Sequence, residues 1–424
     1  MQKSSRRRFL KASAAAGSVL AAGNISANAF PGGNDLVRVG VVGCGGRGSG
    51  AVEQNLRADS NCKLVAVGDA FRDRAEGLVT RLRNHRDADI RGKTDVAAER
   101  IFVGLDAYQR VIENCDLVIL ATPPGFRPMH IEAAVRARKH LFTEKPVAVD
   151  APGVRTVLTA FETANTNNLC VVAGTQRRYQ TSYIETMRRI HDGALGTITS
   201  GQVFWNQGQL WHRTREEGMT DVTWQLRNWL YFTWLSGDHI CEQHIHNLDV
   251  ANWALNAHPV KAMGTAGRQV RTGPEFGNIF DHFATDYEYP NGAHVLSMCR
   301  QIPGCANSVS ESFAGTRGAW TSNGYRITGE RPWAFARATD NQPYQEEHNA
   351  LYRAIRAGNR VNDLRTVAES TLTAIMGRMT GYTGKEVTWD QALASRETLM
   401  PANLTWDTPL PTPPVAVPGR TELT

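Results

Sequence analysis

The chain has 424 residues, 42% of them hydrophobic and 21% charged, and a formal net charge of +6. A chain of this length exceeds the usual size of one hydrophobic core, so we expect two domains. Residues 1–29 contain five basic residues and no acidic one, which leaves only +1 for the rest of the chain. The charge therefore gives no support to nucleic-acid binding, and we expect no nucleic-acid partner.

Residues 1–29 have the pattern of a twin-arginine signal peptide. Arg6-Arg7-Arg8 precedes a small, apolar stretch from Ala12 to Ala22, and Ala27-Asn28-Ala29 offers an A-x-A cleavage site. The stretch is too short and too rich in Ala, Gly and Ser for a membrane anchor across about 30 Å. We expect recognition by the Tat export machinery, cleavage after Ala29 and a periplasmic or otherwise exported enzyme.

Residues 36–175 alternate apolar strands with helical patterns. This alternation predicts a parallel sheet covered on both faces, as in a Rossmann dinucleotide-binding domain. The strands are expected near residues 36–43, 62–68, 101–103, 116–122, 139–143 and 169–174.

The turn Gly43-Cys44-Gly45-Gly46-Arg47-Gly48 follows the first strand and leads into a helix expected over Ser49–Arg57. In a GxGxxG turn Gly43 permits the tight bend, Gly45 lets the backbone approach a pyrophosphate, and Gly48 lets helix and strand pack closely. We place Gly46 and Arg47 in the same cofactor site.

A carboxylate follows the second strand. Asp69 directly follows the strand expected near residues 62–68. At this position its carboxylate can accept hydrogen bonds from an adenosine ribose, which favours NAD. Arg72 keeps NADP as the less favoured alternative, because a guanidinium can receive a 2′-phosphate. No cysteine among the seven shows metal-ligand or disulfide spacing.

Two further strands lead into loops that carry candidate site residues. The strand 116–122 runs into Thr122-Pro123-Pro124, and the strand 139–143 runs into Glu144-Lys145-Pro146. The carboxyl ends of strands border the ligand crevice of an open α/β sheet, so Lys145 is placed to meet a substrate over the nicotinamide.

After Gln176 the pattern changes to more alternating strands, expected over 198–205, 258–265, 280–289, 293–300 and 320–328. Alternation predicts a mostly antiparallel sheet in a second α/β domain, which we assign to residues 176–400. Residues 401–424 contain five prolines from Pro409 to Pro418, which predict an extended arm on the surface or on a neighbouring subunit.

A helix is expected over Gly237–Trp253, with residues 239, 242, 246, 249 and 253 on one face. That face carries His239, Glu242, His246 and Asp249. A cation held by His239, Glu242 and His246 is an alternative, but nothing in the sequence offers a fourth ligand, and we predict no metal.

Taken in order, Gly43–Gly48, Thr122-Pro123 with His130 behind it, Glu144-Lys145-Pro146 and Gly174–Tyr179 resemble the Gfo/Idh/MocA oxidoreductases. The resemblance extends from about Val37 to about Thr383. It implies NAD as cofactor, a Rossmann domain, and a C-terminal α/β domain whose open sheet often mediates oligomerisation, hence a homodimer or homotetramer.

The resemblance also implies site residues. The family's acid, histidine and aspartate fall on Glu242, His246 and Asp249, although the family more often has Asp at the first place. His246 would act as general base or acid beside Lys145. The cofactor set gains Thr122, Pro123, His130, Glu144 and Lys145, and the substrate set comprises Arg177, Arg178, Tyr179 and His246, which Trp205 joins from an aromatic-rich segment. Two alternatives stay open: one of the arginines could only brace the domain interface, and Asp249 could serve as a buried hydrogen-bonding group.

Aromatic residues crowd between Phe204 and Leu235. Sugars pack their C–H faces on such rings, so a saccharide-binding insertion is one interpretation, and packing of the sheet or of a subunit interface is the other. Polar partners for sugar hydroxyls would be Asn206, Gln207, His212, Arg213 and Arg227.

The sequence thus predicts an exported, NAD-dependent oxidoreductase acting on a sugar, glycoside or cyclitol. No free nicotinamide pool exists outside the cytoplasm, so we expect a tightly bound cofactor recycled between substrates. The alternative is an NAD-assisted, redox-neutral glycoside hydrolase, and a binding protein without catalysis is the third possibility.

Overall fold

The computed structural model describes residues 35–424. The predicted signal peptide, residues 1–29, lies outside this range. Within residues 35–424 no helix has both the length and the apolar character needed to cross a membrane.

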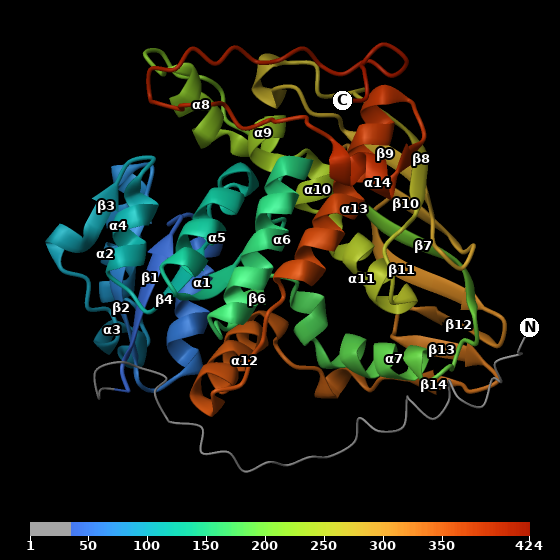
Figure 1. The fold of residues 1–424 in the computed structure, drawn as a ribbon, viewed down its shortest axis with the longest axis horizontal. Coiled ribbons are helices and arrows are strands. Elements are labelled where there is room, and N and C mark those ends of the chain that lie inside the picture. The colour runs from blue at the N-terminus through green and yellow to red at the C-terminus, as the bar shows by residue number, and fades with distance from the viewer. Residues whose placement is uncertain (1–34) are drawn as a thin grey trace, which may run out of the picture. The chain divides into compact units, whose positions relative to one another are not determined.

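The first half forms a six-stranded, all-parallel sheet in the order β3-β2-β1-β4-β5-β6 (Figure 1). Its strands are β1 (Val37–Val42), β2 (Cys62–Asp69), β3 (Ile101–Val103), β4 (Leu117–Leu120), β5 (His140–Thr143) and β6 (Val171–Ala173). Each lies where the sequence predicts it, because runs of Val, Leu and Ile suit strands buried on both faces. The order reverses between β1 and β4, and ligands bind at such a switch point.

Helices connect these parallel strands. They are α1 (Gly46–Ala58), α2 (Arg72–Arg83), α3 (Ala88–Gly92), α4 (Ala107–Glu113), α5 (Arg127–Arg136) and α6 (Ala151–Thr166). The first of them begins at Gly46, three residues earlier than expected, so the glycine-rich turn is itself the start of the helix.

The second half forms a nine-stranded sheet in the order β14-β13-β12-β11-β7-β10-β9-β8-β15. All neighbours are antiparallel except β7 and β10, which confirms the mostly antiparallel prediction. The strands are β7 (Ile198–Gln207), β8 (Lys261–Gly267), β9 (His282–Glu288), β10 (His294–Gln301), β11 (Ser308–Gly315), β12 (Gly318–Thr321), β13 (Arg326–Gly329), β14 (Trp333–Ala334) and β15 (Val387–Thr388).

This sheet differs from the expectation in several details, and the short edge strands β14 and β15 were not predicted. The strand predicted over 320–328 is a hairpin of β12 and β13, turned at Gly324 and Tyr325, which both have positive φ. A further strand, β11, was not predicted, because its serines hide the alternation with buried Glu311 and Phe313.

Helices of the second half lie against one face of this sheet and against the first domain. They are α7 (Thr181–His191), α8 (Asp221–Arg227), α9 (Thr233–Ser236), α10 (His239–Glu242), α11 (Ile245–Leu255), α12 (Pro343–Ala357), α13 (Leu364–Thr383) and α14 (Trp389–Ala394).

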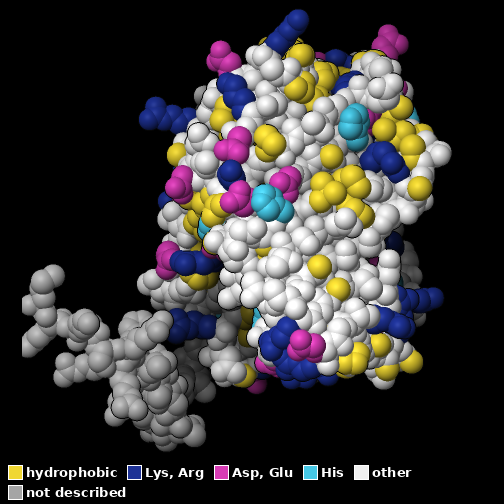
Figure 2. Space-filling view, turned by 90° about the vertical axis from the view of Figure 1, so that its right-hand side faces the viewer, with side chains coloured by type: hydrophobic (Ala, Val, Ile, Leu, Met, Phe, Trp, Pro, Cys, Tyr) yellow, Lys and Arg dark blue, Asp and Glu magenta, His cyan; other side chains and the backbone are white. Residues whose placement is uncertain are grey.

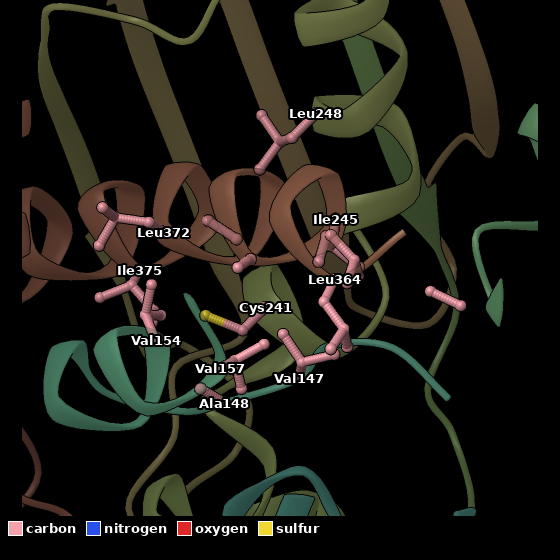
Figure 3. Packing of buried hydrophobic residues seen from close by; sticks show 14 of the residues in the cluster. Val147, Ala148, Val154, Val157, Cys241, Ile245, Leu248, Leu364, Leu372 and Ile375 are labelled. Atoms are coloured by element: carbon pink, nitrogen blue, oxygen red, sulfur yellow. The ribbon is translucent and has the colours of Figure 1, made fainter. Parts of the chain in front are cut away.

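One apolar core joins the two sheets. Figure 3 shows Val154 and Val157 of α6 facing Leu372 and Ile375 of α13, with Cys241 of α10 and Ile245 of α11 beside them. Val147 and Ala148, directly after Lys145-Pro146, are fully buried in the same cluster. This core therefore fixes the loop after β5 relative to α10 and α11.

The helix expected over Gly237–Trp253 is interrupted, which corrects the single-helix prediction. α10 ends at Glu242 and α11 begins at Ile245, with Gln243 and His244 between them. The break changes the direction of the side chains, so His239 no longer shares a face with His246.

The opposite face of the nine-stranded sheet forms the side of the molecule seen in Figure 2, where hydrophobic side chains lie among charged residues and histidines. Met263 is 60% exposed and Leu296 37% exposed on this face. A shallow depression there is lined by residues of β7, β9, β10, β11 and β12.

The tail, residues 401–424, contains neither helix nor strand and lies on its own chain. It passes beside α8 and α9 in Figure 1 and then returns towards α14. The Gly419 amide donates to the Thr383 carbonyl at 2.9 Å near the end of this path.

Candidate active site

The glycine-rich turn after β1 has the shape of a phosphate cradle. Gly43 has φ +94°, and a Cβ there would stand 2.6 Å from the Ala121 carbonyl carbon. A Cβ at Gly48 would overlap the Gly43 carbonyl oxygen, whereas one at Gly45 or Gly46 would meet no atom within 4 Å. The turn thus leaves open space at the N-terminus of α1, where a pyrophosphate fits.

Asp69 holds this turn from the end of β2. Its carboxylate accepts hydrogen bonds from the Cys44 amide at 2.7 Å and the Phe71 amide at 2.9 Å. Burial raises the pKa of the Asp69 carboxyl. Asp69, Gly43 and Gly45 line a hollow, here called the Asp69 pocket.

The arginine that kept NADP as an alternative lies outside the Asp69 pocket. Arg72 is largely exposed and pairs with Glu76 at 3.0 Å, one turn along α2. The arginine of this helix that lines the pocket is Arg74. Arg72 is therefore not placed to receive a 2′-phosphate on a ribose that binds beside Asp69.

His130 forms part of the floor of the Asp69 pocket. Its ring stacks on Tyr108 with centroids 4.3 Å apart, and its Nδ1 lies 3.3 Å from the Thr122 hydroxyl. Burial lowers the pKa of His130 to about 3, so the ring is neutral. It supports the Thr122-Pro123 loop, which borders both this hollow and the next.

The second hollow, here called the Lys145 pocket, adjoins the first at Gly45, Gly46, Thr122 and Pro123. It is lined by side chains from both domains, among them Arg47, Arg127, Glu144, Lys145, Gln176, Trp205, Trp229, Glu242, Gln243, His246 and Tyr344.

Lys145 and Glu242 meet across the domain boundary. The Lys145 ammonium donates to the Glu242 carbonyl oxygen at 2.5 Å and lies 3.4 Å from its Oε1. The Lys145 side chain is only 11% exposed, so these contacts form largely out of reach of water. Glu144 pairs with Arg47, which joins the loop after β5 to the glycine-rich turn.

His246 faces the same hollow from α11. Its ring stacks on Trp205 with centroids 5.7 Å apart and planes 27° apart. Burial, with the positive charges of Lys145 and Arg177, holds the pKa of His246 well below its usual value. The imidazole is therefore neutral and able to accept a proton.

Four predicted site residues lie outside the lining of both pockets. Arg178 forms a bidentate pair with Asp249, in which Nε donates to Oδ2 at 2.8 Å and Nη2 donates to Oδ1 at 2.9 Å, and Ser370 also donates to Asp249. Tyr179 donates to Asp363 at 2.6 Å. Arg177 pairs with buried Glu311 and lies 5.6 Å from the Trp205 ring centroid. These contacts tie residues 177–179 to β11, to α11 and to the start of α13, so the two arginines brace the packing between elements.

The predicted alternative of a metal at His239, Glu242 and His246 has no geometric support. His239 Nδ1 lies 2.8 Å from Asp238, and its ring packs on Phe283. Among residues 35–424 no group of three His, Cys, Asp or Glu side chains is placed to hold a metal ion.

The aromatic-rich segment divides into two groups. Trp224, Tyr231, Phe232 and Trp234 are buried in an apolar cluster, as the packing interpretation predicts. In contrast, Trp205 and Trp229 line the Lys145 pocket, as the saccharide interpretation predicts. The proposed sugar partners Arg213 and Arg227 lie instead at the Asp69 pocket.

Two functional candidates, Arg127 and Glu347, were missed from the sequence. Arg127 is buried and donates to the carbonyl oxygens of Pro146 at 2.5 Å and Thr122 at 2.7 Å, so it braces both loops. Glu347 of α12 is fully buried, and neither carboxyl oxygen has a hydrogen-bond partner among the described residues. It lies 3.8 Å from Arg47 Nη2, and burial raises its pKa well above the usual value. No local motif marks either contact.

Comparison with known proteins agrees with this geometry. Residues 37–174 match the family model described as "Oxidoreductase family, NAD-binding Rossmann fold", and residues 183–321 match the "GFO/IDH/MocA C-terminal domain".

Among curated proteins, a glycosyl hydrolase family 109 protein of Streptomyces coelicolor is 30% identical over 170 residues, 39% of this chain and 33% of that protein. An inositol 2-dehydrogenase of Rhizobium meliloti is 25% identical over 230 residues, 54% of this chain and 58% of that protein. The matches thus span a third to somewhat over half of these relatives.

Among solved structures, scyllo-inositol dehydrogenase from Lactobacillus casei with bound NAD(H) and scyllo-inositol superposes with a TM-score of 0.63. The match has 16% identity and covers 84% of this chain and 99% of that one, which shows a common fold. With both domains of one family matched in order on this fold, the chain belongs to the Gfo/Idh/MocA family and carries its NAD-binding Rossmann domain.

Proposed function

We propose that this protein is an NAD-dependent oxidoreductase acting on a CH–OH group of a sugar, glycoside or cyclitol. One observation carries the proposal: Lys145 and His246, from different domains, line one hollow that continues into the cradle at Gly45 and Gly46. A cofactor extending from Asp69 past the cradle would bring its nicotinamide towards Lys145.

His246, Lys145 and Glu242 have separate roles in the proposed oxidation of an alcohol. Neutral His246 accepts the hydroxyl proton of the substrate. The Lys145 ammonium donates a hydrogen bond to the same oxygen and stabilises its developing negative charge, while Glu242 keeps Lys145 in place. Bound NAD would supply the hydride acceptor for this oxidation, so that the carbinol carbon becomes a carbonyl.

The lining of the Lys145 pocket suits a polyhydroxylated substrate. Trp205 and Trp229 offer flat faces for C–H groups, whereas Gln176 and Gln243 offer donors and acceptors for hydroxyls. The inositol 2-dehydrogenase relative supports this class of substrate.

A panel of sugars and cyclitols, each added with NAD, tests the proposal. NADH formation by the wild-type protein, with loss in Lys145→Ala and His246→Ala at unchanged NAD affinity, would support it. Tight NAD binding without hydride transfer from any member of a broad panel would contradict it.

We further propose that the protein is exported by the twin-arginine pathway to the periplasm with NAD already bound. The signal pattern of residues 1–29 supports export. In that compartment the hydride must return from the retained cofactor to a second substrate or to the same one. The uncovered face of the nine-stranded sheet supports assembly as a homodimer or homotetramer.

A second candidate function is NAD-assisted glycoside hydrolysis without net redox change. The glycosyl hydrolase family 109 relative favours it. In this cycle the carbinol carbon would give its hydride to bound NAD and become a carbonyl, which acidifies the neighbouring C–H. That C–H would lose its proton as the glycosidic C–O bond breaks and the aglycone leaves as an alcohol. Water would then add H and OH across the resulting double bond, and the stored hydride would return to the carbonyl carbon. Free sugar and aglycone with no accumulated NADH would indicate this function, and a ketosugar or lactone would indicate the first.

A further inference from the structure

The Asp69 pocket has a second wall that an open Rossmann sheet does not provide. Its floor consists of residues of the first domain, including Gly43, Asp69 and His130. The opposite wall is formed by Trp211, Arg213, Leu226, Arg227 and Trp229, all from the segment between β7 and α9. The second domain thus reaches over the place where adenosine binds in a dinucleotide fold.

A specific contact fastens this wall to the first domain. Arg227 forms two hydrogen bonds to the carboxylate of Asp73, at 2.7 and 2.9 Å. Its guanidinium also lies over the ring of Phe71, 3.9 Å from the ring centroid. Asp73 and Phe71 flank the start of α2, directly after Asp69, so Arg227 bridges the rim of the pocket.

The C-terminal tail supports the wall from outside. The Trp406 ring lies 5.5 Å from the Phe71 ring, so Phe71 stands between the tail and Arg227. The Leu410 amide donates to Asp221 at 3.0 Å, and its carbonyl oxygen accepts from Gln225 at 2.5 Å. Both acceptor and donor belong to α8, the helix that ends at Arg227, and Figure 1 shows the tail beside it.

We propose that residues 211–229 and the tail around Trp406 form a clamp that binds the adenosine half of NAD and slows its release. The clamp rests on the proposed use of NAD. Release is slowed because Arg227 must leave Asp73 and Phe71 before this wall can move away from the first domain. A bidentate pair stacked on a ring constrains this movement more than a simple surface ion pair does.

The rate of NADH release measures the clamp without using catalysis. Protein saturated with NADH is mixed with excess NAD, and the decay of bound NADH fluorescence is followed in the wild type, Arg227→Gln, Asp73→Asn and Trp406→Ala. We expect release at least tenfold faster in each variant, with NADH still bound at equilibrium.

Arg365→Gln is the matched control. Arg365 pairs with Glu162 at 2.7 Å and lies 4.6 Å from the Phe161 ring centroid, the same kind of contact at a distant place. Its release rate should equal that of the wild type. Thermal unfolding shows whether Trp406→Ala is folded, and so distinguishes a loosened clamp from a loss of folding. If Trp406→Ala does not fold, Arg227→Gln and Asp73→Asn still provide the test.

Equal release rates in the wild type, Arg227→Gln and Asp73→Asn would overturn the clamp while leaving NAD use intact. Failure of the folded wild-type protein to bind NADH at all would overturn the proposed function together with the clamp. The equilibrium titration before mixing separates these two results.

Discussion

The Lys145 ammonium lies 2.5 Å from the Glu242 carbonyl oxygen and 3.4 Å from the Glu242 carboxylate. These residues are 97 positions apart and belong to different domains. The contact fixes the lysine that follows β5 against the helix that precedes His246. The contact thereby fixes the positions of Lys145 and His246, which would act on the same hydroxyl, relative to each other.

Glu242→Gln should lower kcat more than it changes KM. The carboxamide keeps the size of the side chain but removes the negative charge beside Lys145, so the ammonium loses part of its orientation. A misplacement of this kind costs roughly 10²-fold in rate. Steady-state kinetics of Glu242→Gln and Glu242→Asp measure it, and a change confined to KM would contradict the positioning role.

The lowered pKa of His246 leads us to expect an unusual pH dependence of kcat/KM. Its pKa lies well below 6.5, so the neutral, proton-accepting form persists through pH 6 to 7 and is lost only at lower pH. We expect kcat/KM to show no fall near pH 6.5 on the acid side. His246→Gln should lose on the order of 10²–10⁴-fold activity, and a fall in wild-type activity centred at pH 6.5 would contradict this assignment.

Gly45→Ala and Gly48→Ala should fail in different ways. A methyl group at Gly48 overlaps the Gly43 carbonyl oxygen, so we expect a loss of about 1–3 kcal/mol in the free energy of unfolding. A methyl group at Gly45 meets no protein atom, so the unfolding temperature should hold while NAD affinity falls. Calorimetry and NAD titration of both variants separate the two roles.

Glu347→Gln should stabilise the protein at neutral pH. Burial raises the pKa of Glu347 in the folded state, so between the unfolded value, about 4.3, and the raised one the unfolded chain binds fewer protons. Stability of the wild type therefore falls as pH rises through this window.

The gain in Glu347→Gln should accordingly vanish below about pH 4. Glu132→Gln, an exposed acid paired with Arg136, is the control and should change little at any pH. Equal effects of the two substitutions on denaturant unfolding at pH 7 would contradict the raised pKa of buried Glu347.

The first domain could be predicted almost strand by strand, because its buried strands are continuous apolar runs and its turn chemistry is local. In the second domain, β11 was missed since its serines conceal the inward-facing Glu311 and Phe313. The helix predicted through Gln243 and His244 is broken, because spacing alone reports a helical face and gives no sign of an interruption.

At the site, the sequence predicted Lys145, Glu242 and His246 together, and the structure places them at one hollow. Asp249 and Arg178 carry the residue types of a reaction site, yet they neutralise each other behind it. Glu347 and Arg227 could not be found from local patterns, because their partners Arg47 and Asp73 lie 300 and 154 positions away.

The most direct test is a single turnover with a substrate carrying deuterium on its carbinol carbons. The protein is loaded with NAD, mixed with the labelled sugar or cyclitol, quenched rapidly, and its cofactor is analysed by mass spectrometry. Deuterium on the reduced nicotinamide in the wild type, and its absence in Lys145→Ala, is the predicted result. A bound cofactor that never acquires the label from any substrate that binds would contradict hydride transfer at this site.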